Sequence, residues 1–254
     1  PVSIMCGIFG HVGYLPQQLA QHCTDTLAHR GPDGAGLWHT PEVTFGHRRL
    51  SILDLSDNAK QPMSYADGRY HITFNGEIYN FLEIRSELES KGYRFHSQSD
   101  TEVVLAAFTA WGEACLSRFN GMWAFALWDV ERKALIISRD RFSVKPLYYH
   151  LSREQLVFAS EIKQILPLLD KTGVNESVML KYLRQALLDD TDETFFNGIK
   201  KVPPRSFITL DLDSRQLKNT QYYNFEPDNN PKLIDENDYT EYCRYLFQSS
   251  VEIR

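Results

Sequence analysis

Two hydrophobic patterns run along this chain, and each predicts a different kind of element. Apolar residues alternate with polar ones or form short continuous runs in some segments, which is typical of strands. In other segments they recur every three or four residues, which is typical of helices. The first pattern predicts strands at residues 43–49, 70–74, 122–128, 134–138, 146–151, 155–160 and 206–212. The second predicts helices at residues 19–27, 80–91, 100–111, 161–168, 176–187 and 237–254.

Turn and capping residues indicate how these elements follow one another. The polar turns DVERK and SRE each join two predicted strands into a hairpin. Asn80 and Glu83 have the spacing of a capping box at a helix start, and Gly92 follows the end of that helix. Asp100 lies at or near the N-cap of the next helix. Because strands dominate the middle of the chain and helices flank them, the predicted class is α+β with layered sheets.

The chain divides into three parts by composition. Residues 6–213 hold the strands and most helices, and we expect them to form one domain. Residues 214–236 are polar and rich in Asn, Asp and Pro, which favours a linker. Residues 237–254 form an amphipathic helix with no later element to pack against. We therefore expect that helix to be the first of a second domain that the sequence truncates.

Composition and charge exclude several classes of protein. The 254 residues are 43% hydrophobic, which is enough for a core, and the net charge of −6 disfavours nucleic-acid or anionic membrane partners. No run of 18 apolar residues predicts a transmembrane helix, and no basic, hydrophobic N-terminal segment predicts a signal peptide. These absences lead us to expect a cytoplasmic protein.

The cysteines and histidines give no metal or redox signature. No two of the four cysteines have C-x-x-C spacing, and no histidines have H-E-x-x-H spacing, so neither a metal site nor a redox motif is predicted. Cys23, Cys115 and Cys243 lie in helix-like stretches among apolar residues. We expect these three to be ordinary buried thiols.

Cys6, in the segment MCGIFG, has two interpretations. It can be a small apolar residue at the start of a buried strand. It can also be a nucleophile if the chain is cleaved after Met5, because Cys6 would then carry a thiol and a free α-amine. An α-amine has a pKa near 8 and can accept a proton from the thiol of the same residue near neutral pH. The amide bond to residues 1–5 would abolish that base.

The segment NGEIYN offers groups that could stabilise an oxyanion. Asn75 and Gly76 follow a predicted strand and precede a predicted helix. The Asn75 side-chain amide and the Gly76 backbone N–H are a plausible donor pair for acyl transfer. The alternative is a plain turn, since Asn-Gly is a common turn dipeptide.

Three further segments hold charged residues with possible binding roles. In HRRLSILD, strand alternation sends Arg48 and Arg49 to opposite faces, so one is solvated and the other needs an anion such as a carboxylate. The residues alone do not choose between them. Asp100 in SDTEVV is a helix cap unless a cation is bound nearby. HRGPDGAG is not a phosphate loop, because no helix follows Gly36.

Eight segments in order carry a resemblance to a known family: MCGIFG, HRGPDGAG, HRRLSILD, NGEIYN, SDTEVVL, NGMWAFALWD, RDRFSVKPLYY and FASEIKQIL. From Cys6 to Asp213 the chain resembles the class II glutamine amidotransferase domain of glutamine-hydrolysing asparagine synthetases. The resemblance implies an N-terminal-nucleophile (Ntn) hydrolase fold, a four-layer αββα sandwich of two antiparallel sheets. It also implies hydrolysis of L-glutamine to glutamate and ammonia, without a cofactor for this chain.

The resemblance also implies roles for the residues of this sequence that match the family motifs. Cys6 matches the nucleophile, which forms a γ-glutamyl thioester, and Asn75 and Gly76 match the oxyanion hole. Arg49, rather than Arg48, matches the arginine that binds the glutamine α-carboxylate.

The other matches line the same pocket. Leu50 and Ile52 match residues that contact glutamine through their backbone. Glu77 and Asp100 match the acidic side that receives the α-ammonium group. A zwitterionic substrate needs one cation and one anion in place, and these residues supply both.

The sequence departs from the family pattern in three places. Residues PVSI precede Met5, whereas the family normally begins at the cysteine after removal of Met. Ser143 and Val144 stand where the family usually has Gly and Ile. The ATP-pyrophosphatase domain is absent, so ATP, Mg²⁺ and aspartate are implied only for a missing synthetase domain that would receive the ammonia.

Two alternatives remain beside the asparagine synthetase interpretation. The same glutaminase could serve another carboxylate acceptor, such as a sugar or peptide intermediate. The second alternative is a non-catalytic domain that is retained for assembly or regulation. In that case residues 1–5 block the α-amine of Cys6. Family members often form homodimers, so a homodimer is a possible assembly.

Overall fold

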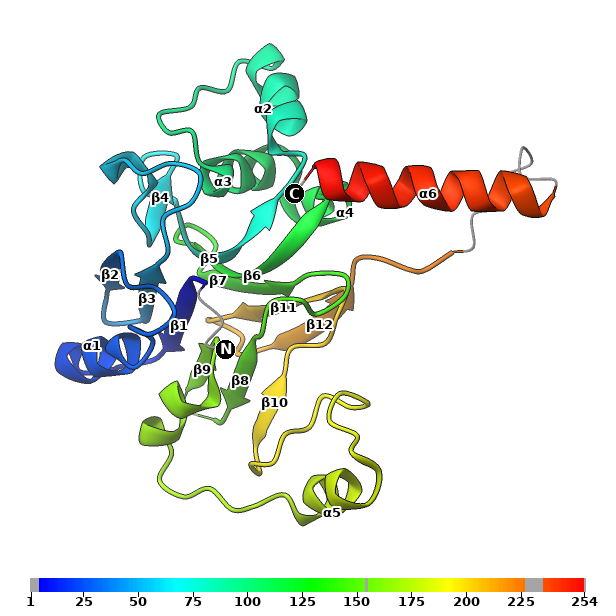
Figure 1. Ribbon diagram of the computed structural model, residues 1–254. Coiled ribbons are helices and arrows are strands. Elements are labelled where there is room, and N and C mark those ends of the chain that lie inside the picture. The colour runs from blue at the N-terminus through cyan, green and yellow to red at the C-terminus, as the bar shows by residue number, and fades with distance from the viewer. Residues whose placement is uncertain (1–4, 154, 227–234, 254) are drawn as a thin grey trace.

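Two six-stranded antiparallel sheets lie against each other in the computed structural model, which describes residues 5–153, 155–226 and 235–253 (Figure 1). The strand order of the first sheet is β10 (Ile199–Lys201), β8 (Tyr148–Leu151), β9 (Leu156–Ala159), β1 (Gly7–Val12), β3 (Val43–Arg49), β2 (Gly34–His39). The order of the second is β12 (Leu217–Gln221), β11 (Ser206–Asp211), β7 (Ala134–Arg139), β6 (Gly121–Asp129), β5 (Tyr70–Ile78), β4 (Met63–Tyr65).

Strand alternation divides the apolar residues between the layers. In β6, Ala124 and Ala126 belong to the cluster between the two sheets, whereas Trp123 and Phe125 belong to the cluster on the outer face of the second sheet. The cluster between the sheets also contains Phe45, which lies in β3 of the first sheet. Since successive strand residues point to opposite faces, a strand buried on both sides joins two cores at once.

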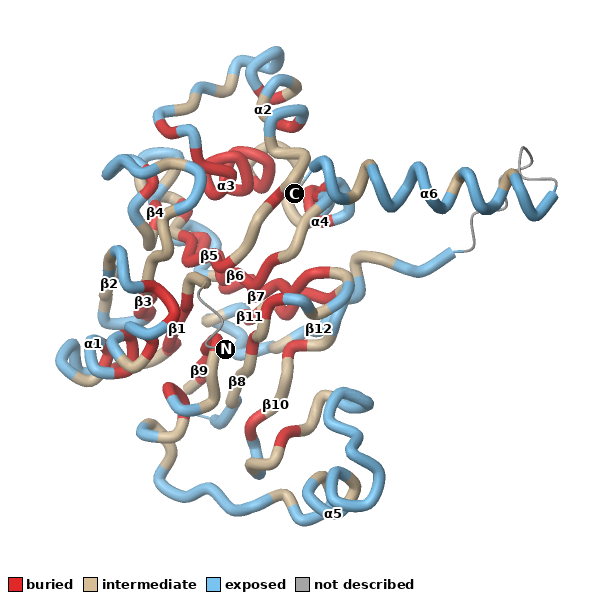
Figure 2. The backbone as a smooth tube through the Cα atoms, viewed as in Figure 1, coloured by how far each residue is buried: buried red, intermediate tan, exposed pale blue. Residues whose placement is uncertain are grey.

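Helices cover both outer faces and complete four layers. Helix α1 (Gln17–Asp25) places Ala20 and Cys23 against Phe9 of β1 on the first sheet. Helices α2 (Phe81–Ser90) and α3 (Asp100–Trp111) cover the second sheet, where α3 is almost wholly buried (Figure 2). The predicted αββα sandwich is therefore confirmed.

Short helices and two exposed helices make up the rest. The short ones are η1 (Asp57–Ala59), η2 (Gly112–Ala114), α4 (Cys115–Arg118), η3 (Ile162–Gln164) and η4 (Leu166–Leu168). The exposed ones are α5 (Glu176–Gln185) and α6 (Glu236–Glu252), neither of which has a buried residue (Figure 2). Within the described residues, no helix is both long and apolar enough to cross a bilayer.

Both predicted hairpins form, as β6–β7 and β8–β9. The helix predicted at residues 161–168 is wrong, because two 3₁₀ turns take its place. Pro167 has no N–H to continue an α-helical ladder.

Two local predictions around the oxyanion segment are corrected, and the prediction that Asp100 lies at or near a helix N-cap is confirmed. The strand predicted to end at Phe74 continues to Ile78, because β6 pairs with it along its whole length. Asn80 makes no capping bond; its side chain instead bonds the backbone of Arg118 and Asn120. The N-cap of α3 is Ser99, so Asp100 is the first residue inside the helix.

Two predictions near the end of the chain also change. Strand β12 lies within the segment predicted to be a linker, where Leu217–Gln221 pairs with β11; residues 227–234 of that segment lie outside the described residues. The linker prediction therefore does not hold for residues 217–221. Cys23 and Cys115 are buried as predicted, but Cys243 is exposed on α6, a helix in which no residue is buried.

Candidate active site

One pocket of about 260 Å³ contains all eight residues to which the family resemblance assigns a catalytic or binding role. It lies where the start of β1, the end of β3 and the second half of β5 meet the first turn of α3. Its lining includes Cys6, Arg49, Leu50, Ile52, Asn75, Gly76, Glu77 and Asp100. Segments up to 94 positions apart in the chain are thus brought to one site, as the spacing from Cys6 to Asp100 shows.

The Cys6 thiol lies in this pocket just before the first strand. Its Sγ is 3.4 Å from the backbone nitrogen of Leu50, which donates to it. Burial raises the pKa of the Cys6 thiol, and the Leu50 contact opposes that shift. The thiol is therefore held in place by the loop after β3, and its conversion to thiolate depends on nearby charge.

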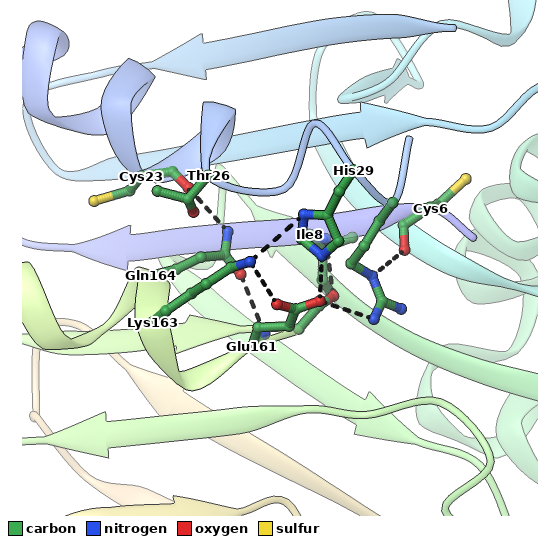
Figure 3. A network of polar contacts seen from close by, with 10 residues as sticks. Cys6, Ile8, Cys23, Thr26, His29, Glu161, Lys163 and Gln164 are labelled. Atoms are coloured by element: carbon green, nitrogen blue, oxygen red, sulfur yellow. Dashed lines mark hydrogen bonds and ion pairs between the residues drawn. The ribbon is translucent and has the colours of Figure 1, made fainter. Parts of the chain in front are cut away.

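A buried arginine, Arg30, holds the backbone of Cys6; Figure 3 labels Cys6 and Glu161, the two residues that it joins. Arg30 donates from Nε to the Cys6 carbonyl oxygen at 3.1 Å and from a terminal nitrogen to Glu161 at 3.2 Å. Glu161 also accepts from His29 at 2.9 Å and pairs with Lys163 at 3.0 Å. Burial alone would raise the pKa of Glu161, but these hydrogen bonds lower it. The carboxylate therefore stays charged and holds Arg30 under the nucleophile.

Asn75 presents an unpaired donor to the pocket. Asn75 is only 1% exposed, and its side-chain nitrogen Nδ2 has no hydrogen-bond partner within the part of the chain that the structure describes. A buried donor without a partner costs about 1–3 kcal/mol, which a ligand oxygen would recover. The observation supports the donor interpretation of Asn75 and excludes the turn, because Asn75 lies inside β5.

Gly76 brings backbone close to the neighbouring strand. A Cβ added there would lie 2.6 Å from the Met122 carbonyl oxygen and 2.9 Å from the Trp123 Cα. Glycine is thus required by close approach of two strands rather than by turn geometry.

The two arginines of HRRLSILD do face different surroundings, as predicted. Arg49 lines the pocket, and its guanidinium donates to the backbone carbonyls of Ser56 and Asp54. Arg48 bonds the Gly31 carbonyl and pairs with Asp25 of α1. Tertiary structure therefore places Arg49, and not Arg48, in the pocket. The expectation that the other arginine is solvated is wrong, because the Arg48 side chain is only 16% exposed.

Two carboxyl groups form the acidic side of the pocket. Asp100 is buried, and its Oδ2 accepts from the Ile78 backbone N–H at 3.0 Å. Burial first, and then the nearby Glu77 charge, raise the pKa of Asp100 to about 7, against the opposing Ile78 bond. Burial also raises the pKa of Glu77, which Lys145 opposes. Both carboxyls would gain from a bound cation.

Other pocket residues were missed by the sequence reasoning. Gln61 accepts from the Phe74 backbone N–H at 2.6 Å and donates to Thr101 at 3.3 Å, linking the η1 loop to β5 and α3. No local pattern marks this glutamine. Lys145 also lines the pocket. It lies in RDRFSVKPLYY, a segment that carries the family resemblance but gave no role to this lysine. Among the described residues, no cluster of three His, Cys, Asp or Glu side chains is arranged to hold a metal ion.

Two facing antiparallel sheets with a cysteine at the start of a central strand define the Ntn-hydrolase fold. Residues 5–223 match the glutamine amidotransferase domain family, and the chain belongs to that family. A solved structure of the same fold is the glutamine phosphoribosylpyrophosphate amidotransferase of B. subtilis, with a TM-score of 0.64 and 19% identity, covering 86% of this chain and 49% of that one.

Two curated relatives have higher sequence identity. Asparagine synthetase [glutamine-hydrolyzing] 3 of Bacillus subtilis is 38% identical over 97% of this chain and 41% of its own length. Amidase chry2 of Gibberella zeae is 35% identical over 91% of this chain and 34% of its own length. The chain thus spans roughly a third to two fifths of the length of these two relatives.

Proposed function

We propose that this chain is the glutaminase part of an ATP-dependent asparagine synthetase, hydrolysing L-glutamine to glutamate and ammonia. The observation that carries the proposal is the unpartnered Nδ2 of buried Asn75 in the pocket that holds the Cys6 thiol. A nucleophile and a vacant donor in one pocket are what acyl transfer from an amide requires.

Charges in the pocket suit the ends of a zwitterionic amino acid. The Arg49 guanidinium would bind the α-carboxylate, with the backbone of Leu50 and Ile52 beside it. Glu77 and Asp100 would receive the α-ammonium, whose positive charge favours their ionised forms. This arrangement fixes the side-chain amide of glutamine toward Cys6.

The proposed reaction has two steps, formation of a γ-glutamyl thioester with release of ammonia and then hydrolysis of that thioester. Once the peptide bond after Met5 is cleaved, the α-amine of Cys6 accepts the thiol proton and the thiolate attacks the amide carbon. Asn75 and Gly76 stabilise the resulting oxyanion. The carbon–nitrogen bond then breaks, the amine proton passes to the leaving nitrogen, and ammonia departs. Water attacks the γ-glutamyl thioester, the amine accepts its proton, and glutamate leaves as the thiol re-forms.

The acceptor of the ammonia belongs to the rest of the protein. Aspartate activated by ATP and Mg²⁺ is the acceptor that the synthetase relatives favour, and this chain's own reaction needs no cofactor. Each cysteine is an unpaired thiol among the described residues, which supports a reducing compartment such as the cytoplasm. An acceptor other than aspartate is the alternative, since one relative of this chain is named an amidase and not an asparagine synthetase.

Controlled release of the N-terminus tests the proposal. We would express the chain behind a cleavable leader so that proteolysis leaves Cys6 first, and measure glutamate formed from L-glutamine. Hydrolysis is expected only after cleavage, and Cys6→Ala should abolish it. The matched control is the uncleaved chain, in which the α-nitrogen of Cys6 is still part of a peptide bond. Equal hydrolysis by the cleaved chain and by Cys6→Ala would refute the mechanism.

A further inference from the structure

Lys145 is a buried cation of the pocket to which the reaction above gives no role. It is only 8% exposed and lines the pocket together with Cys6 and Glu77. Its backbone is fixed on both sides: its N–H donates to Asp140 Oδ2 at 3.0 Å, and its carbonyl accepts from Arg139 Nε at 2.8 Å. The side chain therefore reaches the pocket from a rigid backbone.

The ammonium group lacks a close counter-ion. Within the described residues it makes no hydrogen bond and no ion pair shorter than 4 Å, and the residue as a whole is only 8% exposed. Burial lowers the pKa of Lys145; the negative charges of Cys6, Glu77 and Asp140 raise it, and Arg30 lowers it. A buried, unpaired ammonium is costly, so a negative charge developing in this pocket would be stabilised by it.

The Cys6 thiol is the group on which that charge can develop. Burial raises its pKa most strongly, and Asp100 raises it further. The Leu50 backbone contact lowers it, as do the positive charges of Lys145 and Arg49. Lys145 has the largest effect of the three charged side chains. Arg49 is already engaged by backbone carbonyls, whereas Lys145 keeps its charge unpaired.

We propose that Lys145 is a positioning residue for the nucleophile, whose ammonium stabilises the thiolate of Cys6. The inference rests on the proposed function only in taking Cys6 as the nucleophile. Thiol and thiolate interconvert in this pocket whether or not glutamine is hydrolysed. Lys145 can therefore be tested apart from glutaminase activity, on the chain with residues 1–5 in place.

The pH profile of Cys6 alkylation is the direct measurement. Iodoacetamide reacts with the thiolate, so the rate of carbamidomethylation at Cys6, followed by peptide mass spectrometry from pH 6 to 10, reports its ionisation. Lys145→Met should move the midpoint of the profile to higher pH, and a midpoint that is higher by about one pH unit leaves roughly tenfold less thiolate at about pH 7.5. Lys145→Arg should keep the wild-type profile. Lys60→Met, which removes an exposed lysine between pocket residues Ala59 and Gln61, should also leave it unchanged.

A profile for folded Lys145→Met that overlays the wild-type curve would overturn the proposal. Should that variant fail to fold, the reciprocal measurement decides. The titration of Lys145, followed by NMR of ¹³Cε-labelled lysine, should move to lower pH in Cys6→Ala, because the thiolate that favours the ammonium is gone. Identical Lys145 titrations in the two proteins would also overturn it. If the chain cleaved after Met5 showed no glutaminase activity while wild type and Lys145→Met still differed in Cys6 alkylation, the result would count against the proposed function alone.

Discussion

Arg30 and the backbone at Cys6 are joined by two reciprocal contacts. Arg30 donates from its side chain to the Cys6 carbonyl, and its own carbonyl accepts from the Met5 N–H at 3.1 Å. The turn after α1 and the start of β1 are thereby tied together at the candidate nucleophile. Glu161, from the segment after β9, holds the Arg30 guanidinium from the other side.

Arg30→Met should therefore loosen the start of β1. The change removes the bond to Cys6 and one of the partners of Glu161, and we expect it to lower the free energy of unfolding by about 1–3 kcal/mol. Urea denaturation followed by circular dichroism measures this. Lys163→Met removes an exposed partner of the same Glu161 and should cost about 0–1 kcal/mol. Equal urea midpoints for the two variants would contradict the assignment.

Removal of the unpartnered amide should affect catalysis more than stability. Asn75→Ala deletes a donor that bonds nothing in the described structure, so the folded state loses little hydrogen bonding. If the amide binds the oxyanion, kcat for glutamine should fall about 10²–10³-fold. Steady-state kinetics on the chain with Cys6 at its N-terminus, beside a thermal melt of each variant, separate the two effects. A kcat within twofold of wild type would remove Asn75 from the mechanism.

Gly76→Ala should destabilise the fold and disturb the pocket together. The new Cβ meets backbone atoms of Met122 and Trp123 at 2.6 and 2.9 Å, so the two strands must separate. We expect a loss of about 1–3 kcal/mol in urea denaturation. Gly34→Ala in β2 is the matched control, because its Cβ would meet only Arg49 Cβ at an ordinary 3.7 Å. If both variants lose the same stability, steric crowding at Gly76 is not the cause.

The raised pKa of Asp100 predicts a definite pH dependence of stability. The pKa is about 7 in the folded chain and near 3.8 without the fold, so the folded state binds the extra proton between these values. The contribution of Asp100 to stability is therefore fully present below pH 4 and is lost as pH rises to 7. The difference in unfolding free energy between wild type and Asp100→Asn should fall by about 2–4 kcal/mol over that range.

Urea denaturation of both proteins at pH 4, 5.5, 7 and 8.5 measures this difference, and other titrating groups largely cancel between them. The difference should still fall slightly above pH 7, where Asp100 is half ionised, and be constant above about pH 8. A difference that grows as pH rises from 4 to 7 would show that Asp100 is ionised in the folded protein.

The four thiols should react in a fixed order. Cys243 is exposed on α6 and should be alkylated first in the native protein. Burial raises the pKa of Cys23 to about 11 and that of Cys115 further, so both should remain unlabelled until denaturant is added. Cys6 should fall between these groups. Timed labelling with iodoacetamide and peptide mass spectrometry checks the order; early labelling of Cys115 would contradict its burial in the folded chain.

The sequence by itself determined the layered fold and the membership of the site. Periodicity and local turn residues predicted the hairpins β6–β7 and β8–β9 and the helix α3, because these depend on patterns within one segment. The motif resemblance named Cys6, Arg49 and Asp100, which the structure gathers in one pocket.

Tertiary structure decided what depends on partners distant in the chain. Strand β5 extends through Asn75 because β6 pairs with it, and a turn dipeptide cannot reveal that pairing. The choice of Arg49 over Arg48 follows from which face of β3 meets the pocket. Lys145 became a pocket residue only when the segment after β7 folded against the pocket that Cys6 lines, since burial and charge at a site are properties of the assembled neighbours.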